Sequence, residues 1–129
     1  MERSTKILIV EDNFLIAEEM RLTLTGAGHV VVGTTGNPDQ ALVLAERHHP
    51  DLAIVNLGLT DWQAGASIAS RLSQRDARLR IILCTGFPDT ALERAGIGAL
   101  VSEVVHKPWS TAELLGAIDR CLGGRTEKR

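Results

Sequence analysis

The stretch DLAIVNLGLTD, residues 51–61, decides how the chain folds and raises the question of what it does. Four apolar residues, 52–55, run directly into a lone polar residue, Asn56. A short apolar run of this kind is typical of a strand that is buried on both faces. The Thr60 and Asp61 that follow favour the start of a helix. The amide of Asn56 is therefore expected at the tip of a buried strand, where α/β proteins place their ligand-binding groups.

The rest of the chain alternates between short apolar runs and amphipathic stretches. The apolar runs predict strands at residues 6–10, 29–33, 52–56, 80–84 and 99–105. The amphipathic stretches predict helices at residues 13–26, 38–47, 61–73, 89–95 and 110–122. This alternation, with short loops, predicts an α/β fold: a doubly wound parallel sheet with helices on both faces.

The ends of the predicted helices carry recognisable signals. In the first helix, Ile16, Met20 and Leu24 form one inward stripe. Ser110 and Glu113 form a capping box at the start of the last helix, and Gly123 with Gly124 is expected to end it. We therefore expect one domain over residues 1–122 and a frayed tail over residues 123–129.

Composition narrows the class of protein. The chain has 129 residues, of which 44% are hydrophobic and 23% charged, which favours one globular domain. A net charge of −2 without a basic stripe disfavours direct nucleic-acid binding. The apolar runs are too short to span a bilayer, and the N-terminus lacks a signal-peptide pattern. Cys84 and Cys121 are read as small core residues in a reducing compartment, so a cytoplasmic location is expected.

Polar residues follow four of the five predicted strands. Glu11 and Asp12 come after the first strand, Asn56 ends the third, and Thr85 and Lys107 follow the fourth and fifth. The carboxyl ends of parallel strands meet at one edge of the sheet, so these side chains are expected to converge. Adjacent carboxylates attract a hard cation such as Mg²⁺. A hydroxyl and an ammonium are suited to holding phosphoryl oxygens.

Four motifs carry a resemblance to a known family. They are VEDN (10–13), DLAIVNLGLTD (51–61), ILCTGF (82–87) and HKPW (106–109), each at the end of a predicted strand. In this order and at these separations, they make residues 5–122 resemble the receiver domain of two-component response regulators. The resemblance implies a flavodoxin-like (βα)5 fold in three layers, with strand order 2-1-3-4-5.

The same resemblance assigns roles to the polar residues. It implies that Glu11, Asp12, Asn56 and the backbone carbonyl of Gly58 form the metal site, and that Thr85 and Lys107 contact the phosphoryl group. Asn56 stands where the family has its phosphoacceptor aspartate. A neutral carboxamide is a poor nucleophile, so the chain as written is not expected to accept phosphate by the family's route.

The resemblance also bears on partners. It implies a sensor histidine kinase or a histidine phosphotransfer protein upstream and an unidentified protein target downstream. A homodimer through the fourth helix, fifth strand and fifth helix is a further possibility that it raises. Val104 stands where many members have an aromatic residue, so an aromatic rotamer switch is not expected here. A stand-alone receiver and a piece of a longer chain both fit the sequence.

Simpler interpretations of the same residues stay open at this stage. Glu11 and Asp12 could cap the first helix, and Asn56 could cap a turn. At the level of function, three hypotheses remain: a receiver that is never phosphorylated, an ordinary receiver whose aspartate has been replaced in this copy, and a phosphohydrolase on the same fold. The last is disfavoured because NLG (56–58) supplies neither a nucleophilic aspartate nor a second acid.

Overall fold

The computed structural model describes residues 5–56, 62–86, 92, 96, 98 and 100–126. Five parallel strands form one sheet in the order β2-β1-β3-β4-β5, which confirms the predicted fold class and strand order. The strands are β1 (Lys6–Val10), β2 (Val30–Thr35), β3 (Leu52–Asn56), β4 (Arg80–Thr85) and β5 (Glu103–His106).

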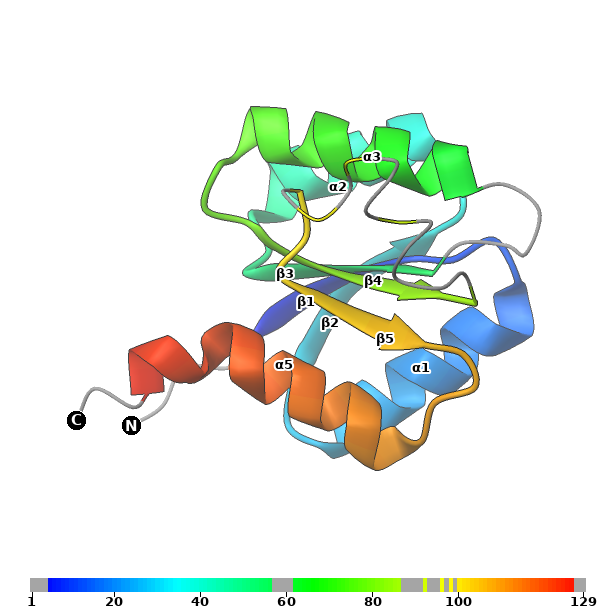
Figure 1. Ribbon diagram of the computed structural model, residues 1–129, viewed down its shortest axis with the longest axis vertical. Helices are drawn as coiled ribbons and strands as arrows, with labels where there is room; N and C mark the ends of the chain where they lie inside the picture. The colour runs from blue at the N-terminus through cyan, green and yellow to red at the C-terminus, as the bar shows by residue number, and fades with distance from the viewer. Residues whose placement is uncertain are drawn as a thin grey trace.

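Helices cover both faces of this sheet. Figure 1 shows α2 and α3 above the sheet and α1 and α5 below it. Their bounds are Phe14–Gly26 for α1, Pro38–His48 for α2, Trp62–Arg75 for α3 and Thr111–Thr126 for α5. No helix within the described part of the chain is long and apolar enough to cross a membrane.

The sheet separates two apolar cores. Alternate residues of each strand point to opposite faces, so neighbours in sequence enter different cores. Ile9 and Ile54 pack with Met20 of α1 and Ile118 of α5. Leu8 and Val55 belong to the other core, with the buried residues Ala41, Ile68 and Leu72 of α2 and α3. Cys84 and Cys121 are free, buried thiols, as predicted.

Side chains cap the helices much as the sequence indicated. The Asn13 side chain accepts a hydrogen bond from the backbone N–H of Ile16 and caps α1. The capping box at α5 is confirmed: the N–H of Ser110 donates to the Glu113 carboxylate at 2.7 Å, and the N–H of Glu113 donates to the Ser110 hydroxyl at 3.1 Å. α2 ends at His48, and His49, the residue that caps it, has a φ of 48° in the left-handed region.

Several predicted boundaries differ from the structure by one or two residues, and two differ by four. The run at 99–105 predicted a strand, but β5 begins only at Glu103, because Leu100 and Val101 pack against the core below α2 and α3 from outside the sheet. α5 does not stop at Leu122 but continues through Gly123 and Gly124 to Thr126. A glycine weakens a helix by about 1 kcal/mol relative to alanine and does not by itself end it.

The buried face of α1 also differs from the prediction. Met20 and Leu24 are buried as expected, but Ile16 is 38% exposed, and Ala17 takes the inward position. Most of the predicted helix at 89–95 lies outside the described residues.

Candidate functional site

Asn56 is held at the carboxyl end of a strand that is buried along its whole length. Every residue of β3 is buried, and Asn56 itself is 6% exposed. Its side chain donates a hydrogen bond from Nδ2 to Oε1 of Glu11, which follows the neighbouring strand β1. The amide therefore links the tips of two adjacent strands.

Glu11 is fixed on both sides by N–H donors. Besides the amide of Asn56, the backbone N–H of Asn13 donates to its Oε2 at 2.8 Å. The backbone N–H of Glu11 donates in turn to the carbonyl of Thr35 at the end of β2, at 2.8 Å. This buried carboxylate thus joins the tips of β1 and β3 to the start of α1.

The pKa of Glu11 is raised above its ordinary value of 4.5, chiefly because burial disfavours the charged carboxylate. The hydrogen bond from Asn13 acts in the opposite direction, and the neighbouring Asp12 raises the pKa further. The positive charge of Lys107 lowers it. Burial outweighs the favourable contacts, so this strand-end acid is harder to ionise than a surface glutamate.

Asp12 lies in a different environment from Glu11. Its side chain is exposed, so the acidic pair divides into one buried and one solvent-facing carboxylate. The alternative in which the pair caps α1 is wrong, because the cap is Asn13 and no acid lies in the first turn. Gly36, after β2, lies against this segment: a Cβ at Gly36 would come within 2.5 Å of the Cα of Asp12.

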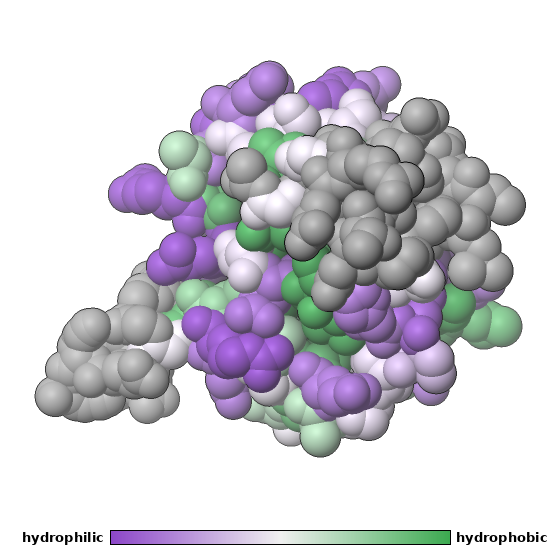
Figure 2. Space-filling model, in the orientation of Figure 1, coloured by the Kyte–Doolittle hydropathy of each residue, from purple (hydrophilic) through white to green (hydrophobic). Residues whose placement is uncertain are grey.

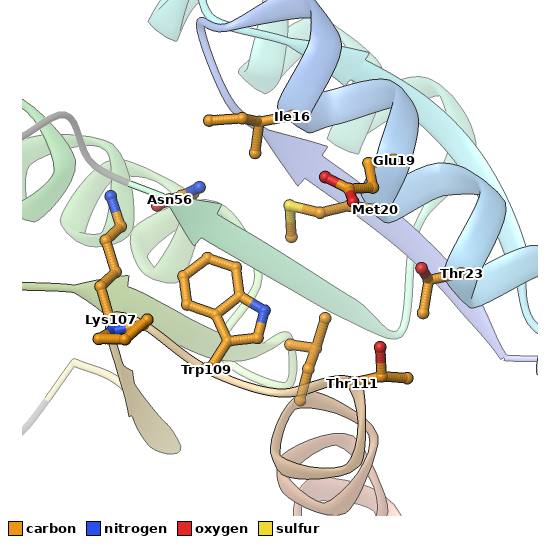
Figure 3. A pocket seen from close by; sticks show the side chains of 10 residues that line it. Ile16, Glu19, Met20, Thr23, Asn56, Lys107, Trp109 and Thr111 are labelled. Atoms are coloured by element: carbon orange, nitrogen blue, oxygen red, sulfur yellow. The ribbon is translucent and has the colours of Figure 1, made fainter.

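Thr85 and Lys107 complete the set at the strand ends. Thr85 is fully buried at the end of β4, and its carbonyl accepts the backbone N–H of Lys107 at 2.9 Å. Asn56 and Lys107 line the same pocket, of about 430 Å³, between α1 and the start of α5 (Figure 3). The structure thus brings Glu11, Asn56 and Lys107 to one end of the sheet, with Thr85 beside Lys107 along the backbone. Gly58 lies outside the described residues.

One polar atom of this site has no partner. The Oδ1 atom of Asn56 is buried and accepts no hydrogen bond in the described structure. A buried acceptor in this state favours a cation or an N–H donor brought by a ligand. Within the described residues, no three His, Cys, Asp or Glu side chains gather as metal ligands. Of the predicted metal ligands, the described residues supply the Asn56 Oδ1 and the carboxylates of Asp12 and Glu11, oxygen donors of the kind that suits Mg²⁺.

The strand order, with polar groups at the strand tips, defines a flavodoxin-like α/β domain. The family description "Response regulator receiver domain" matches residues 7–119. This chain therefore belongs to the response regulator receiver domain family of two-component signalling. Receiver domains are in general signalling domains rather than enzymes, and they typically bind Mg²⁺ in an acidic pocket.

Curated relatives and solved structures agree with this membership. The chain is 30% identical to the transcriptional regulatory protein PdtaR of Mycobacterium tuberculosis, covering 88% of this chain and 55% of that protein. It is 31% identical to the transcriptional regulatory protein PhoP of Escherichia coli, covering 91% of this chain and 52% of that protein. The chain thus spans about half the length of the curated relatives it matches.

Among solved structures, the CheY-like receiver domain protein of Methanospirillum hungatei superimposes with a TM-score of 0.84 at 20% identity, which concerns the fold alone. That match covers 98% of this chain and all of that one. The anti-anti-sigma factor PhyR of Bartonella quintana has a TM-score of 0.79 at 26% identity, over 97% of this chain and 50% of that one.

The sequence did not reveal two features of this end of the molecule. One is Gly36, which the strand pattern does not distinguish from any other loop glycine. The other is the wall of the pocket formed by Glu19, Met20 and Trp109. Trp109, the last residue of the HKPW motif, is partly buried and packs against the core. The sequence did contain one signal for this wall: Glu19 and Met20 follow Ile16 by three and four residues, a spacing that places side chains on the same face of a helix.

Proposed function

We propose that this chain is a receiver domain that is not phosphorylated at residue 56 and that signals through protein contact. The observation that carries the proposal is the amide of Asn56 at the buried tip of β3, donating to Glu11. In the family's reaction an aspartate oxygen attacks phosphorus and the donor's leaving group departs. A carboxamide oxygen is neutral and a poor nucleophile, so this bond does not form.

The remaining residues keep the roles of a receiver pocket in this proposal. Thr85 and Lys107 are the phosphoryl-contacting positions, and Asp12, Glu11 and the Asn56 Oδ1 are the oxygen donors for Mg²⁺. When bound, Mg²⁺ supplies positive charge to that cluster of oxygens. We expect this binding to be weak, because the amide carries no negative charge and both oxygens of Glu11 already accept N–H groups. The carbonyl of Gly58 is a further proposed ligand.

Partners and location follow from the same proposal. The upstream partner is a sensor histidine kinase or a histidine phosphotransfer protein, and the downstream partner is another protein. PhyR, which shares this fold, is named as an anti-anti-sigma factor. The two free, buried cysteines suit a reducing cytoplasm. A homodimer through β5, α5 and the helix between β4 and β5 stays a prediction, because most of that helix lies outside the described residues.

Intact-mass measurement after incubation with acetyl phosphate and Mg²⁺ tests the proposal. We expect the mass of the chain to stay unchanged and Asn56→Asp to gain one phosphoryl group. A stable phosphoryl adduct on residue 56 of the unaltered chain would overturn the proposal. Sequencing the gene in its native genome separates a natural asparagine from an aspartate replaced in this copy. We also expect no turnover of p-nitrophenyl phosphate, which separates the receiver from a phosphohydrolase.

A further inference from the structure

The pocket beside Asn56 has an unusual combination of walls. One wall is α1, which contributes Ile16, Glu19, Met20 and Thr23, and the other is the start of α5 with Trp109 (Figure 3). Met20 is buried and Trp109 is partly buried, so the floor and one side are apolar. The volume of about 430 Å³ is that of a site for one large side chain or one small molecule.

Glu19 is the acidic group of this pocket. Its carboxylate makes no hydrogen bond or ion pair within the described parts of the chain, whereas its neighbour Glu18 is bound to Arg21. Figure 3 shows Glu19 on α1 and the Trp109 ring on the α5 side of the same pocket, with Met20 between them in this view. An unpaired carboxylate and an indole ring that line one pocket can together attract a cation, the first through its charge and the second through the face of the ring.

Two other polar atoms restrict how a cation would sit. Lys107 lines the pocket on the Asn56 side, so its ammonium repels a cation there and favours the Glu19 end (Figure 3). Asn56 lines the same pocket and has a buried acceptor without a partner, Oδ1. A planar group with several N–H donors suits this layout better than a compact ammonium, because it stacks on an aromatic ring and also donates to a carboxylate.

The surface next to the pocket indicates that the cation belongs to a protein. Phe14 and Leu15 at the start of α1 are 76% and 74% exposed, and Ile16, which follows them, lines the pocket. Figure 2 shows hydrophobic surface at the right-hand edge of the molecule, where α1 begins in Figure 1. Exposed apolar side chains that continue into a pocket are typical of a protein-binding surface.

We propose that the pocket between Glu19 and Trp109 receives an arginine side chain of a partner protein, flanked by apolar residues that cover Phe14 and Leu15. The guanidinium pairs with the Glu19 carboxylate and stacks on the Trp109 ring, and its stem lies along Met20. This inference deepens the proposed protein-contact function and rests on it, because it names the chemistry of the partner rather than its identity.

NMR titration of the full, unphosphorylated chain with N-acetyl-arginine amide tests the pocket directly. We expect saturable shifts of the Trp109 indole N–H signal, assigned by its loss in Trp109→Phe. N-acetyl-lysine amide should bind more weakly, and N-acetyl-norleucine amide should give no comparable shift at equal ionic strength. Equal binding of the arginine and lysine amides, or of the norleucine amide, would overturn the assignment.

A pair of variants on α1 supplies the matched control. Glu19→Gln should weaken binding of the arginine amide by about tenfold, the effect of losing one charge-assisted pair. Glu18→Gln, which removes a carboxylate already bound to Arg21, should leave the affinity unchanged. Both positions lie on the solvent-facing part of α1, and the spectrum of each variant reports directly on folding. Equal affinities of the two variants would contradict the proposal.

The outcome is separable from that of the phosphorylation test. If arginine amide fails to bind while the chain also resists acetyl phosphate, the pocket assignment fails and the proposed function stands. If residue 56 is phosphorylated while Glu19-dependent binding is observed, the proposed function fails and the pocket assignment stands.

Discussion

The side-chain amide of Asn56 donates a hydrogen bond to the carboxylate of Glu11, across the boundary between β3 and β1. A carboxylate at residue 56 has no N–H to donate and repels a neighbouring acid until a cation arrives. The amide thus supplies, without a metal, a link between strand tips that two acids need a cation to make. The first two predictions below follow from this contact.

Replacing the amide by an acid should make the domain depend on metal. We expect Asn56→Asp to lower the free energy of unfolding without Mg²⁺ by about 1–3 kcal/mol, because a hydrogen bond is lost and two carboxylates face each other. Mg²⁺ should then raise the Tm of the variant more than that of the unaltered chain. Thermal denaturation with and without Mg²⁺ measures both effects. Asn37→Asp, at the cap of α2, is the matched control, and equal metal-dependent shifts at residues 37 and 56 would reject the idea.

The raised pKa of Glu11 should appear in the pH dependence of stability. The folded chain holds this proton at a higher pH than the unfolded chain, whose Glu11 has an ordinary pKa near 4.5. The free energy of unfolding should therefore fall as pH rises from about 4.5 through the raised pKa. Urea denaturation at a series of pH values should show this decline in the unaltered chain and its reduction in Glu11→Gln. Glu18→Gln, at an exposed ion pair, should retain it; the same slope in Glu11→Gln would contradict the prediction.

A side chain at Gly36 should destabilise the domain. A Cβ at this position would lie 2.5 Å from the Cα and 2.7 Å from the Cβ of Asp12, so the backbone of one loop would have to shift. We expect Gly36→Ala to destabilise the domain by about 1–3 kcal/mol, as overpacking does. Gly26→Ala is the control, because a Cβ there meets nothing within 4 Å. Thermal denaturation compares the two variants. A Tm for Gly36→Ala at or above that of Gly26→Ala would contradict the prediction, because it would mean that the loops accommodate the added Cβ without cost.

The two thiols should be inert in the folded chain. Burial raises the pKa of Cys84 to about 12 and that of Cys121 to about 11, so neither is a thiolate near neutral pH. We expect no reaction with a thiol reagent such as DTNB under native conditions and two equivalents of reaction in denaturant. Rapid native labelling of Cys84 would mean that β4 opens to solvent.

Much of this architecture was predictable from the sequence. The apolar runs at 52–56 and 80–84 and the caps at Asn13 and Ser110 are local signals, and the structure confirms them. The beginning of β5 could not be predicted, because a loop segment whose side chains pack against the core can be as apolar as a strand. The end of α5 could not be predicted either, because a pair of glycines can continue a helix as well as end it.

The residues of the candidate site and the sheet edge where they meet were predicted, but the surroundings of each side chain were not. Glu11 and Asn56 were expected at one edge of the sheet, and they are in contact. That Asp12 faces solvent while Glu11 is buried depends on how the backbone turns after β1, which adjacent residues in a sequence do not reveal. The Glu19 wall was missed because it forms only when α1 and α5 come together from opposite ends of the chain.

The sheet that keeps the two apolar cores apart has a consequence for how sequence changes combine. Ile9 and Leu8 are neighbours in the chain, yet they pack against different sets of helices. The two cores have no residue in common, so the energetic costs of well-separated substitutions, one in each core, should largely add. The core that packs against α1 and α5 can therefore change in evolution while the core that packs against α2 and α3 stays the same. One fold can in this way acquire surfaces for different partners.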